Sequence, residues 1–487
     1  MKTRLSLIIL LLVNLISACA TNPVTGKQEL MLLSEADEIQ MGKSVYPNAM
    51  WGAEGGGGEY KDEQLKAYLS EIVQRIHRAS HRPNLPVSFA IQNSSVPNAW
   101  AIPGYVVITR GLLTGLDSEG EFAFVMGHEI GHVSARHSAR QMSQAILLQL
   151  GLVATGIALQ NQEHGDLILG LGAVGGMFLL RKYSRDDEYE ADRLGVEYMT
   201  KIGYIPRNAV SAHRRLQTIS EQYARSIGAE PRERSFFEEL LSTHPRTQTR
   251  IEEIEKLIVN YRTPYLYGDG TNSIVYKSKI ADAQRIHSIY VNYYDKALRA
   301  YERGNLKEAQ NYLHHAINLD KNQASFYALT GFIMLEKNDF IESERYFRGA
   351  IKVDPNYQPA YRGFGMISYA QRDYNEAINH FKRALTRYSE DIPSHYYIGM
   401  SYYRINRCDQ AIRHLSLSAQ AMPKHKTING IMGDCYDKIG DVESAYKAYS
   451  NQVKIDSTSS IGRQSLNRYN EINRTIEKAR NEKQQKK

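Results

Sequence analysis

The sequence predicts an α+β domain, mostly helical with a small sheet, followed by an all-α solenoid of helical repeats. Three observations predict this architecture. Small residues recur every 34 positions in the C-terminal part of the chain. A short β-rich stretch, residues 106–109, follows two closely spaced prolines in the N-terminal half. Apolar, Pro-free stretches around it favour helices, and 487 residues leave room for more than one core.

The overall composition is that of a globular protein. Hydrophobic residues make up 42% of the chain and charged residues 23%, which excludes intrinsic disorder, collagen and a polytopic membrane protein. The net charge of +7 is scattered and forms no concentrated basic stripe, so no nucleic-acid partner is expected. Three Cys are too few for a disulfide scaffold.

The first 18 residues have the features of a signal peptide. A basic start precedes an apolar run, residues 5–16, that is too short to span a bilayer comfortably. The run ends before Cys19 in a sequence that resembles a bacterial lipobox, which implies cleavage before Cys19 and lipidation of its thiol. Ala20 resembles an outer-membrane sorting signal, so periplasmic localisation with membrane contact through the lipid anchor only is expected. The alternative is a plain signal peptide cut at a nearby small residue.

Composition also divides the mature chain. A polar tether leads to a helical stretch from Ser34, and Gly55–Gly58 form a flexible break. A mixed domain, a linker rich in turn-forming residues, a repeat region and a basic tail follow. We expect the tether and its helix at 19–58, the mixed domain at 59–262 and the linker at 263–286. The repeats are expected at 287–471 and the tail at 472–487.

The repeat region has a strict register. Small residues spaced by 34 occupy two positions of each unit, and an irregular helical bundle does not explain this register. The pattern resembles the tetratricopeptide repeat, in which two antiparallel helices touch at small residues, and about five repeats fit 290–459. Such repeats imply a protein partner. The two small-residue series are Ala309, Ser343, Ala377, Ala411 and Ala445, and Gly331, Gly365, Gly399 and Gly433.

Cys408 and Cys435 fall on repeat helices that should pack together. The two thiols could therefore form a disulfide or remain free and buried.

An H-E-x-x-H pattern carries the chemistry of the first half. On a helix, His128 and His132 project from one face, where two imidazoles can bind one Zn²⁺ ion per chain. Glu129 is then placed to take a proton from water. Chance occurrence is the alternative, since the chain has 15 His. His137 lies five residues beyond His132, roughly 140° round a continuous helix, so a structural role is expected for it.

A third ligand is expected from an acidic stretch downstream. Glu188 and Asp192 are four residues apart on an expected helix. Glu188 would complete a His₂Glu site with an open fourth position, and Asp192 would hydrogen-bond a liganding imidazole and fix its tautomer. A solvated acidic helix face is the alternative, and the paired histidines argue against it.

Two motifs together carry a family resemblance. H-E-x-x-H-x-x-x-R-H at 128–137 and S-R-x-x-E-x-E-A-D at 184–192 resemble the HtpX-like family of gluzincin metalloendopeptidases, which also contains the CAAX prenyl endopeptidases. The resemblance implies a zincin-like metallopeptidase fold for the first domain. It also implies that His128, His132 and Glu188 are zinc ligands and that Glu129 is the general base.

The resemblance extends to a substrate-binding segment. Prolines bracket a short stretch that is expected to form an edge strand, and an exposed edge can pair with a substrate backbone. The alternative is an ordinary hairpin that supports the metal-binding helix. The residues implied by the resemblance are Asn98, Ala99, Trp100 and Ala101.

Two further catalytic residues are implied only by the resemblance. His244 would approach the metal as a fourth ligand or donate to the transition state, and Arg250 would bind the oxyanion or the substrate carbonyl. Between the metal motifs, the apolar runs 145–159 and 167–180 are short for membrane spans, which favours core helices or a lid over the metal.

The resemblance implies a zinc metalloendopeptidase that is anchored to the outer membrane and hydrolyses misassembled envelope proteins. The repeats would recruit these clients or the barrel-assembly machinery. One alternative is a non-catalytic chaperone or scaffold, and the complete metal site argues against it. Another is a zinc amidase acting on peptidoglycan, and the expected edge strand favours polypeptide substrates instead.

Overall fold

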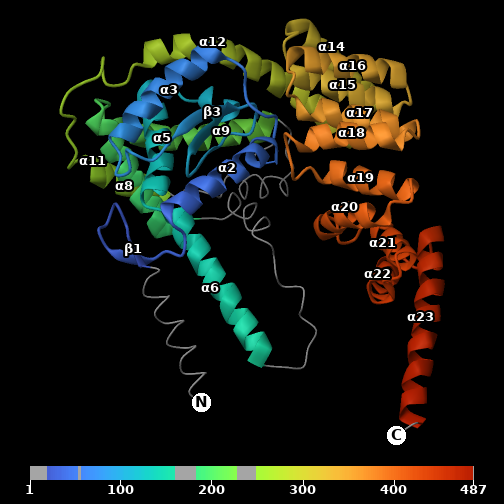
Figure 1. Ribbon diagram of the computed structural model, residues 1–487. Coiled ribbons are helices and arrows are strands. Elements are labelled where there is room, and N and C mark those ends of the chain that lie inside the picture. The colour runs from blue at the N-terminus through green and yellow to red at the C-terminus, as the bar shows by residue number, and fades with distance from the viewer. Residues whose placement is uncertain (1–18, 53–55, 159–182, 227–247, 486–487) are drawn as a thin grey trace, which may run out of the picture. The chain divides into compact units, whose positions relative to one another are not determined.

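The computed structural model describes residues 19–52, 56–158, 183–226 and 248–485. The chain forms two compact units, Met1–Arg303 and Gly304–Lys487. The predicted fold class is confirmed, because the first unit is helical with small sheets and the second consists of paired helices (Figure 1). Within the described ranges, no helix combines the length and the apolar character needed to cross a membrane.

The expected N-terminal tether is partly ordered as a hairpin. Strands β1 (Cys19–Thr21) and β2 (Gln28–Leu30) pair antiparallel. Asn22 holds the turn by accepting from the Val24 amide at 2.9 Å, and its Nδ2 donates to the carbonyl of Ala135 at 3.2 Å. This polar segment is therefore fixed to the residue that ends the helix with the H-E-x-x-H pattern, a contact that its composition does not reveal.

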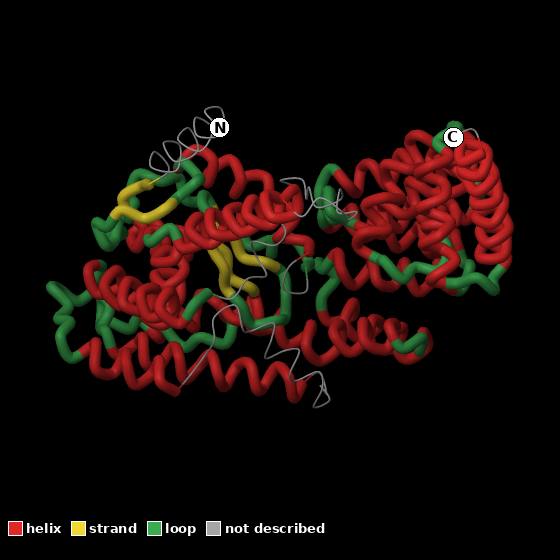
Figure 2. Tube along the Cα trace, turned by 90° about the horizontal axis from the view of Figure 1, so that it is seen from below, coloured by secondary structure: helices red, strands yellow, loops and turns green. Residues whose placement is uncertain are grey.

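The main sheet is small and lies between helices (Figure 2). Its order is β3 (Ser88–Gln92), β5 (Tyr105–Thr109), β4 (Ala99–Ile102), so the expected edge strand is at one end and pairs antiparallel with β5. Helix α2 (Glu35–Gly52) begins directly after Ser34, as expected, and packs on the face that carries Trp100.

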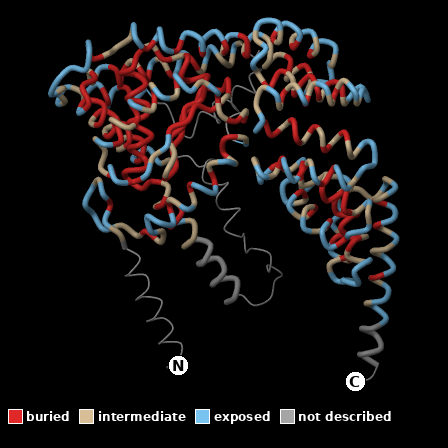
Figure 3. Tube along the Cα trace, turned by 45° about the horizontal axis from the view of Figure 1, so that its top comes forward, coloured by how far each residue is buried: buried red, intermediate tan, exposed pale blue. Residues whose placement is uncertain are grey.

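The opposite face of the sheet is covered by the helix that carries the H-E-x-x-H pattern, α5 (Glu119–Ser134). Phe89 of β3 meets Phe122 of α5 edge to face, with ring centroids 5.9 Å apart. Helix α3 (Glu63–Arg78) packs against both β3 and α5. The buried residues of this unit concentrate around the sheet and α5 (Figure 3). Burial on both faces makes α5 a rigid base for a site.

The structure differs from the expected linker at 263–286. Helix α12 (Ser273–Ile289) continues into a π-helical turn, η2 (Tyr290–Tyr294), and then into α13 (Asp295–Glu302). Tyr276 is fully buried, and its hydroxyl donates to the carbonyl of Leu113 at 2.8 Å. The turn-forming residues before α12 suggest a free connection, but the apolar face of α12 packs on the first unit.

A buried arginine fastens the end of this segment. Arg110 begins the short helix α4 (Arg110–Leu113) and is fully buried. Its Nη1 donates to Nδ1 of His287 at 2.7 Å, and its guanidinium carbon lies 3.9 Å from the ring centroid of Tyr290. Burial and the neighbouring guanidinium lower the pKa of His287 to about 3, so its neutral ring can accept this hydrogen bond.

A chain that ends after residue 286 is expected to be less stable than one that ends after residue 303. The shorter chain lacks His287 and Tyr290, so the Arg110 guanidinium loses an acceptor and an aromatic contact. A charged donor deprived of its partner costs about 2 kcal/mol or more of the free energy of unfolding. Urea unfolding of both chains measures the difference, and equal midpoints would contradict this packing argument.

The second unit contains the repeats in regular helix pairs. Within each pair, the predicted small residue meets a large side chain 16 positions later: a Cβ on Gly331 would lie 2.7 Å from the Phe347 ring, and one on Gly433 would lie 2.5 Å from the Tyr449 ring. This close contact recurs once in each repeat that carries the glycine, which explains why the small residues are spaced by 34 positions. The helices are α14 (Leu306–Leu319), α15 (Ala324–Glu336), α16 (Phe340–Val353), α17 (Gln358–Ala370), α18 (Tyr374–Leu385), α19 (Ile392–Arg404), α20 (Cys408–Ala421), α21 (Ile428–Lys438) and α22 (Val442–Ile455).

The C-terminal end differs from the expected tail at 472–487. Helix α23 (Ser460–Gln485) runs through most of it, packs on α22, and buries Ile472. Of the two alternatives for Cys408 and Cys435, the structure shows free, buried thiols. Of the expected apolar runs, residues 167–180 lie outside the described residues.

Candidate metal centre

Helix α5 presents its two histidines on one buried face. Ser118 caps the helix by accepting from the amide of Glu121 at 3.1 Å, and every residue of α5 is buried. Nε2 of His128 and Nε2 of His132 are 3.1 Å apart. Two ring nitrogens at this separation can share one ion, because tetrahedral Zn–N bonds of about 2.0–2.1 Å place two ligand atoms roughly 3.4 Å apart.

Glu188 reaches this pair from helix α8 (Arg185–Lys201), which Ser184 and Asp187 start with a capping box. Its Oε1 lies 3.5 Å from Nε2 of His132, and its Oε2 lies 3.7 Å from Nε2 of His128. These distances are close to the edges of a coordination tetrahedron. Among the described residues, this trio is the cluster of acidic, His or Cys side chains whose donor atoms could hold a metal ion.

Glycines let α8 approach α5 closely enough for this contact. A Cβ on Gly195 would lie 3.1 Å from the backbone nitrogen of His128, and one on Gly127 would lie 3.2 Å from the Cα of Gly195. Larger side chains at either position would separate the helices. The close crossing therefore sets the distance between the carboxylate and the two imidazoles.

Asp192 holds the first histidine. It lies one turn beyond Glu188, and its Oδ1 is 2.9 Å from Nδ1 of His128. Burial opposes ionisation of Asp192, but Arg250 and the neighbouring histidines outweigh it and hold its pKa well below the usual range. The ionised carboxylate keeps the proton of His128 on Nδ1, which leaves Nε2 free to coordinate a metal.

Arg250 faces the two carboxylates. It lies on α11 (Gln248–Ile258), and its Nη1 is 2.6 Å from Oε2 of Glu188. Its Nε and Nη2 donate to Asp192 at 2.8 and 2.7 Å. In this arrangement, the guanidinium is the counter-ion of the acidic pair, whereas the resemblance implied a donor to the oxyanion or the substrate carbonyl.

His213 also belongs to the site, although no feature of the sequence marks it. It lies on α9 (Arg207–Ser226) with Nε2 3.3 Å from Oδ1 of Asp192 and its ring 5.3 Å from that of Phe124. Burial lowers the pKa of His213, which keeps its ring neutral near pH 7. A single His on an amphipathic helix has no distinguishing spacing, so only the tertiary contact reveals it.

A cavity lies beside His128 and adjoins the edge strand. Glu129 lies on its wall beside His128, and Asn98 and Ala99 line it from the start of β4. Trp100 points to the other face of the sheet, where its Nε1 donates to Oε1 of Gln92 at 3.2 Å. The structure thus brings Asn98 and Ala99 to the site and places Trp100 in the core with α2. Ala101 is buried in β4 and is not part of this cavity lining.

Two of the predicted site residues cannot be placed. His244 lies outside the described residues, and the side chain of Cys19 is not described although its backbone belongs to β1.

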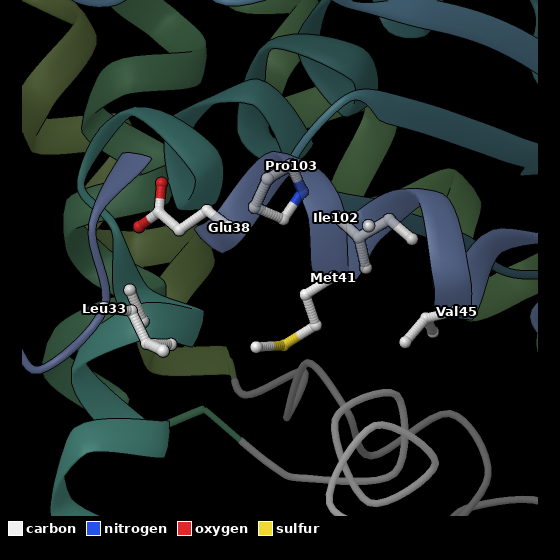
Figure 4. Close-up of a pocket in the computed structure, with 8 residues that line it drawn as sticks. Leu33, Glu38, Met41, Val45, Ile102 and Pro103 are labelled. Atoms are coloured by element: carbon white, nitrogen blue, oxygen red, sulfur yellow. The ribbon is translucent and has the colours of Figure 1, made fainter. Parts of the chain in front are cut away.

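A second cavity lies between α2 and the end of β4 (Figure 4). Met41, Val45, Ile102 and Leu33 make its walls apolar. Its acidic lining residue, Glu38, is paired with Arg82 and Arg136 at 2.8 Å each. The carboxylate of Glu38 is therefore already neutralised, and the cavity lacks the donor set of the metal centre.

Comparison with known proteins gives a match in each part of the chain. Residues 63–258 match the model of peptidase family M48, and residues 334–392 match a tetratricopeptide repeat model. Over 243 residues, the chain is 26% identical to the mitochondrial metalloendopeptidase OMA1 of Schizosaccharomyces pombe, covering 48% of this chain and 65% of that protein. Over 343 residues, it is 25% identical to the beta-barrel assembly-enhancing protease of Escherichia coli, covering 65% of this chain and 67% of that protein.

The chain thus spans about two thirds of the length of these relatives. The family match covers the helices that carry His128, His132 and Glu188, and the repeat match falls within the second unit. Residues 63–258 therefore resemble peptidase family M48 metallopeptidases, and a tetratricopeptide repeat region follows them.

Proposed function

We propose that the protein is a zinc-dependent metalloendopeptidase that hydrolyses misfolded or misassembled envelope proteins in the bacterial periplasm. The observation that carries this proposal is the convergence of His128, His132 and Glu188 beside a cavity that Glu129 also lines. Two imidazoles and one carboxylate form the donor set of a catalytic zinc, with a coordination position left for water or substrate.

The residues of the site suit peptide hydrolysis. A bound zinc ion would supply Lewis-acid polarisation of the scissile carbonyl and would lower the pKa of water. Glu129 accepts a proton from the attacking water and later passes it to the leaving amine. Asp192 keeps His128 in the tautomer that coordinates metal, and Arg250 balances the negative charge of Glu188 and Asp192.

The edge strand supports a polypeptide substrate. Strand β4 ends the sheet next to the cavity that contains Glu129. A substrate strand that pairs with this edge would align its backbone with the metal centre, with little dependence on its side chains. Asn98 and Ala99 are the residues proposed to contact it.

Anchoring at Cys19 and outer-membrane sorting through Ala20 complete the proposal. A lipid-anchored chain in the periplasm would meet unfolded envelope proteins before they insert. The relative named for enhancing β-barrel assembly supports this class of client. Labelling cells with a palmitate analogue should mark the native chain and not a Cys19→Ala variant, and equal labelling would contradict the anchor.

Metal removal tests the catalytic function. The purified mature chain is expected to hydrolyse casein, to lose this activity when zinc is chelated, and to regain it when zinc is restored at one ion per chain. A zinc-loaded chain that binds unfolded protein without cleaving it would instead support a chaperone or scaffold. An assay on peptidoglycan tests the amidase alternative.

The repeats are proposed to recruit clients or the barrel-assembly machinery. A chain that ends after Arg303 keeps the whole first unit. It is expected to cleave a short casein-like peptide at the rate of the full chain but to cleave an unfolded outer-membrane protein several-fold more slowly. Measuring kcat/KM for both substrates separates the effects, and an equal loss on both would argue against recruitment.

A further inference from the structure

The chain bends directly after the helix that carries His128 and His132. Helix α5 ends at Ser134, and Arg136 adopts a left-handed backbone conformation, with φ of 56°, before α6 (His137–Ala158) begins. The Arg136 side chain fixes this turn, because its Nε donates to Oε1 of Glu38 at 2.8 Å and its Nη2 to the carbonyl of Leu33 at 2.7 Å. A residue after this turn no longer follows the angular spacing of α5.

His137 consequently folds back onto a metal-site histidine. Its Nδ1 lies 2.8 Å from Nδ1 of His132, and the side chain of His137 is fully buried. On its far side, Nε2 lies 3.1 Å from Oε2 of Glu190. The expectation of a purely structural His137 assumed a continuous helix, and the left-handed residue removes that assumption.

The direction of these hydrogen bonds follows from the chemistry of the imidazole ring. Nε2 of His132 faces Glu188 and His128, so it must carry a lone pair if it is to bind a cation there. The proton of His132 is then on Nδ1 and is donated to Nδ1 of His137. The proton of His137 must in turn be on Nε2, where the Glu190 carboxylate accepts it.

We propose that His137 is a positioning residue that orients His132 and fixes its tautomer, with Glu190 fixing the tautomer of His137. This inference rests on the proposed function, because it assigns a role toward the same metal ion. The two liganding histidines are thus supported differently: His128 directly by the Asp192 carboxylate, and His132 by an imidazole that a carboxylate holds.

The surroundings of His132 support this role. The ring of Tyr183 stacks on that of His132 with centroids 3.9 Å apart, and its hydroxyl lies 2.9 Å from Oγ of Ser138. Ser138 is the neighbour of His137 on α6. The first turn of α6 therefore contacts His132 in two ways: His137 bonds its Nδ1, and Ser138 bonds the tyrosine that stacks on its ring. The orientation of the His132 ring thus depends on that turn.

Two substitutions at His137 separate hydrogen bonding from packing. In His137→Asn, the side-chain oxygen takes the place of Nδ1 and can accept from His132, whereas His137→Leu offers no acceptor. We expect His137→Leu to weaken zinc binding roughly 10- to 100-fold, the usual effect of losing a residue that holds a metal ligand. The zinc affinity of His137→Asn should stay within about threefold of the native value, because the acceptor for His132 is kept. Competition against a chromophoric chelator measures both dissociation constants, and the visible spectrum of the cobalt-substituted chain reports ligand geometry.

His77→Leu is a matched control. His77 lies on α3 and is also buried, and its Nε2 lies 2.7 Å from the carbonyl of Leu85. Neither residue lines the cavity or belongs to the group of metal-binding side chains. This variant should lower the unfolding midpoint without changing zinc affinity. It shows what the loss of a buried histidine does to stability alone.

The outcomes separate this inference from the proposed function. Native affinity in His137→Leu, or equal losses in the Leu and Asn variants, would overturn the positioning role while the metal centre stands. A native chain that binds no zinc would overturn both. If the Leu variant does not fold, rescue by His137→Asn with an unchanged cobalt spectrum supports the inference, and an altered spectrum opposes it.

Discussion

A Glu129→Gln variant is expected to bind one zinc ion per chain and to hydrolyse protein at least about 100-fold more slowly than the native chain. The amide has nearly the shape of the carboxylate, so the cavity wall beside His128 is preserved. The amide cannot take a proton from water, so the step assigned to Glu129 is lost. Zinc analysis by mass spectrometry, combined with casein turnover, measures both properties on the same sample.

Glu121→Gln provides a matched control for this variant. Glu121 lies on the same helix and is also buried, but its Oε2 accepts from the amide of Asp117 at 2.7 Å and lines no part of the cavity. This substitution should leave turnover unchanged. Native turnover in Glu129→Gln would remove Glu129 from the mechanism, and loss of zinc would show that the substitution disturbs the metal site.

An Arg250→Met variant is expected to lose about 3–5 kcal/mol of the free energy of unfolding when no metal is present. Arg250 is buried, and its removal leaves the carboxylates of Glu188 and Asp192 without their nearest cation. Added zinc should recover part of the loss, because it restores positive charge beside Glu188 and binds only the folded chain. Urea unfolding with and without zinc measures both effects.

Arg214→Met is the control for this second variant. The Arg214 side chain is 65% exposed and pairs with Glu255 at 2.8 Å on the surface of the same unit. Exposed ion pairs contribute little, so its loss should change the free energy of unfolding by less than about 1 kcal/mol. Equal effects of the two substitutions would mean that Arg250 is not the counter-ion of a buried acidic pair.

Local patterns explain why the sequence predicts some features well. The 34-residue register reflects a contact between two adjacent helices of one unit, such as Gly331 against Phe347, so a periodic sequence encodes it directly. The edge strand and the start of α2 after Ser34 are likewise local. A β-rich stretch next to two prolines marks the strand, and the Ser34 hydroxyl accepts from the amide of Asp37 at 3.2 Å where the helix begins. Their positions therefore follow from sequence alone.

The ordering of the connecting segments was not predictable in this way. Residues rich in turn formers suggest a free linker before α12 and a tether before α2. In the structure, Arg110 is hydrogen-bonded to His287, 177 positions away in the sequence, and Asn22 is hydrogen-bonded to Ala135, 113 positions away. Such partners are distant in the sequence, and no spacing rule connects them.

By itself, the sequence determined the repeat solenoid and the two imidazoles of His128 and His132, because each depends on the period of a single helix or helix pair. Only the tertiary structure decided which groups hold those imidazoles: Asp192 with Arg250 and His213 on one side, and His137 with Glu190 on the other. The physical reason is that helix crossing at glycines and one left-handed residue, Arg136, set these contacts. Neither the crossing distance nor the direction of that turn is expressed in the periodicity of the chain.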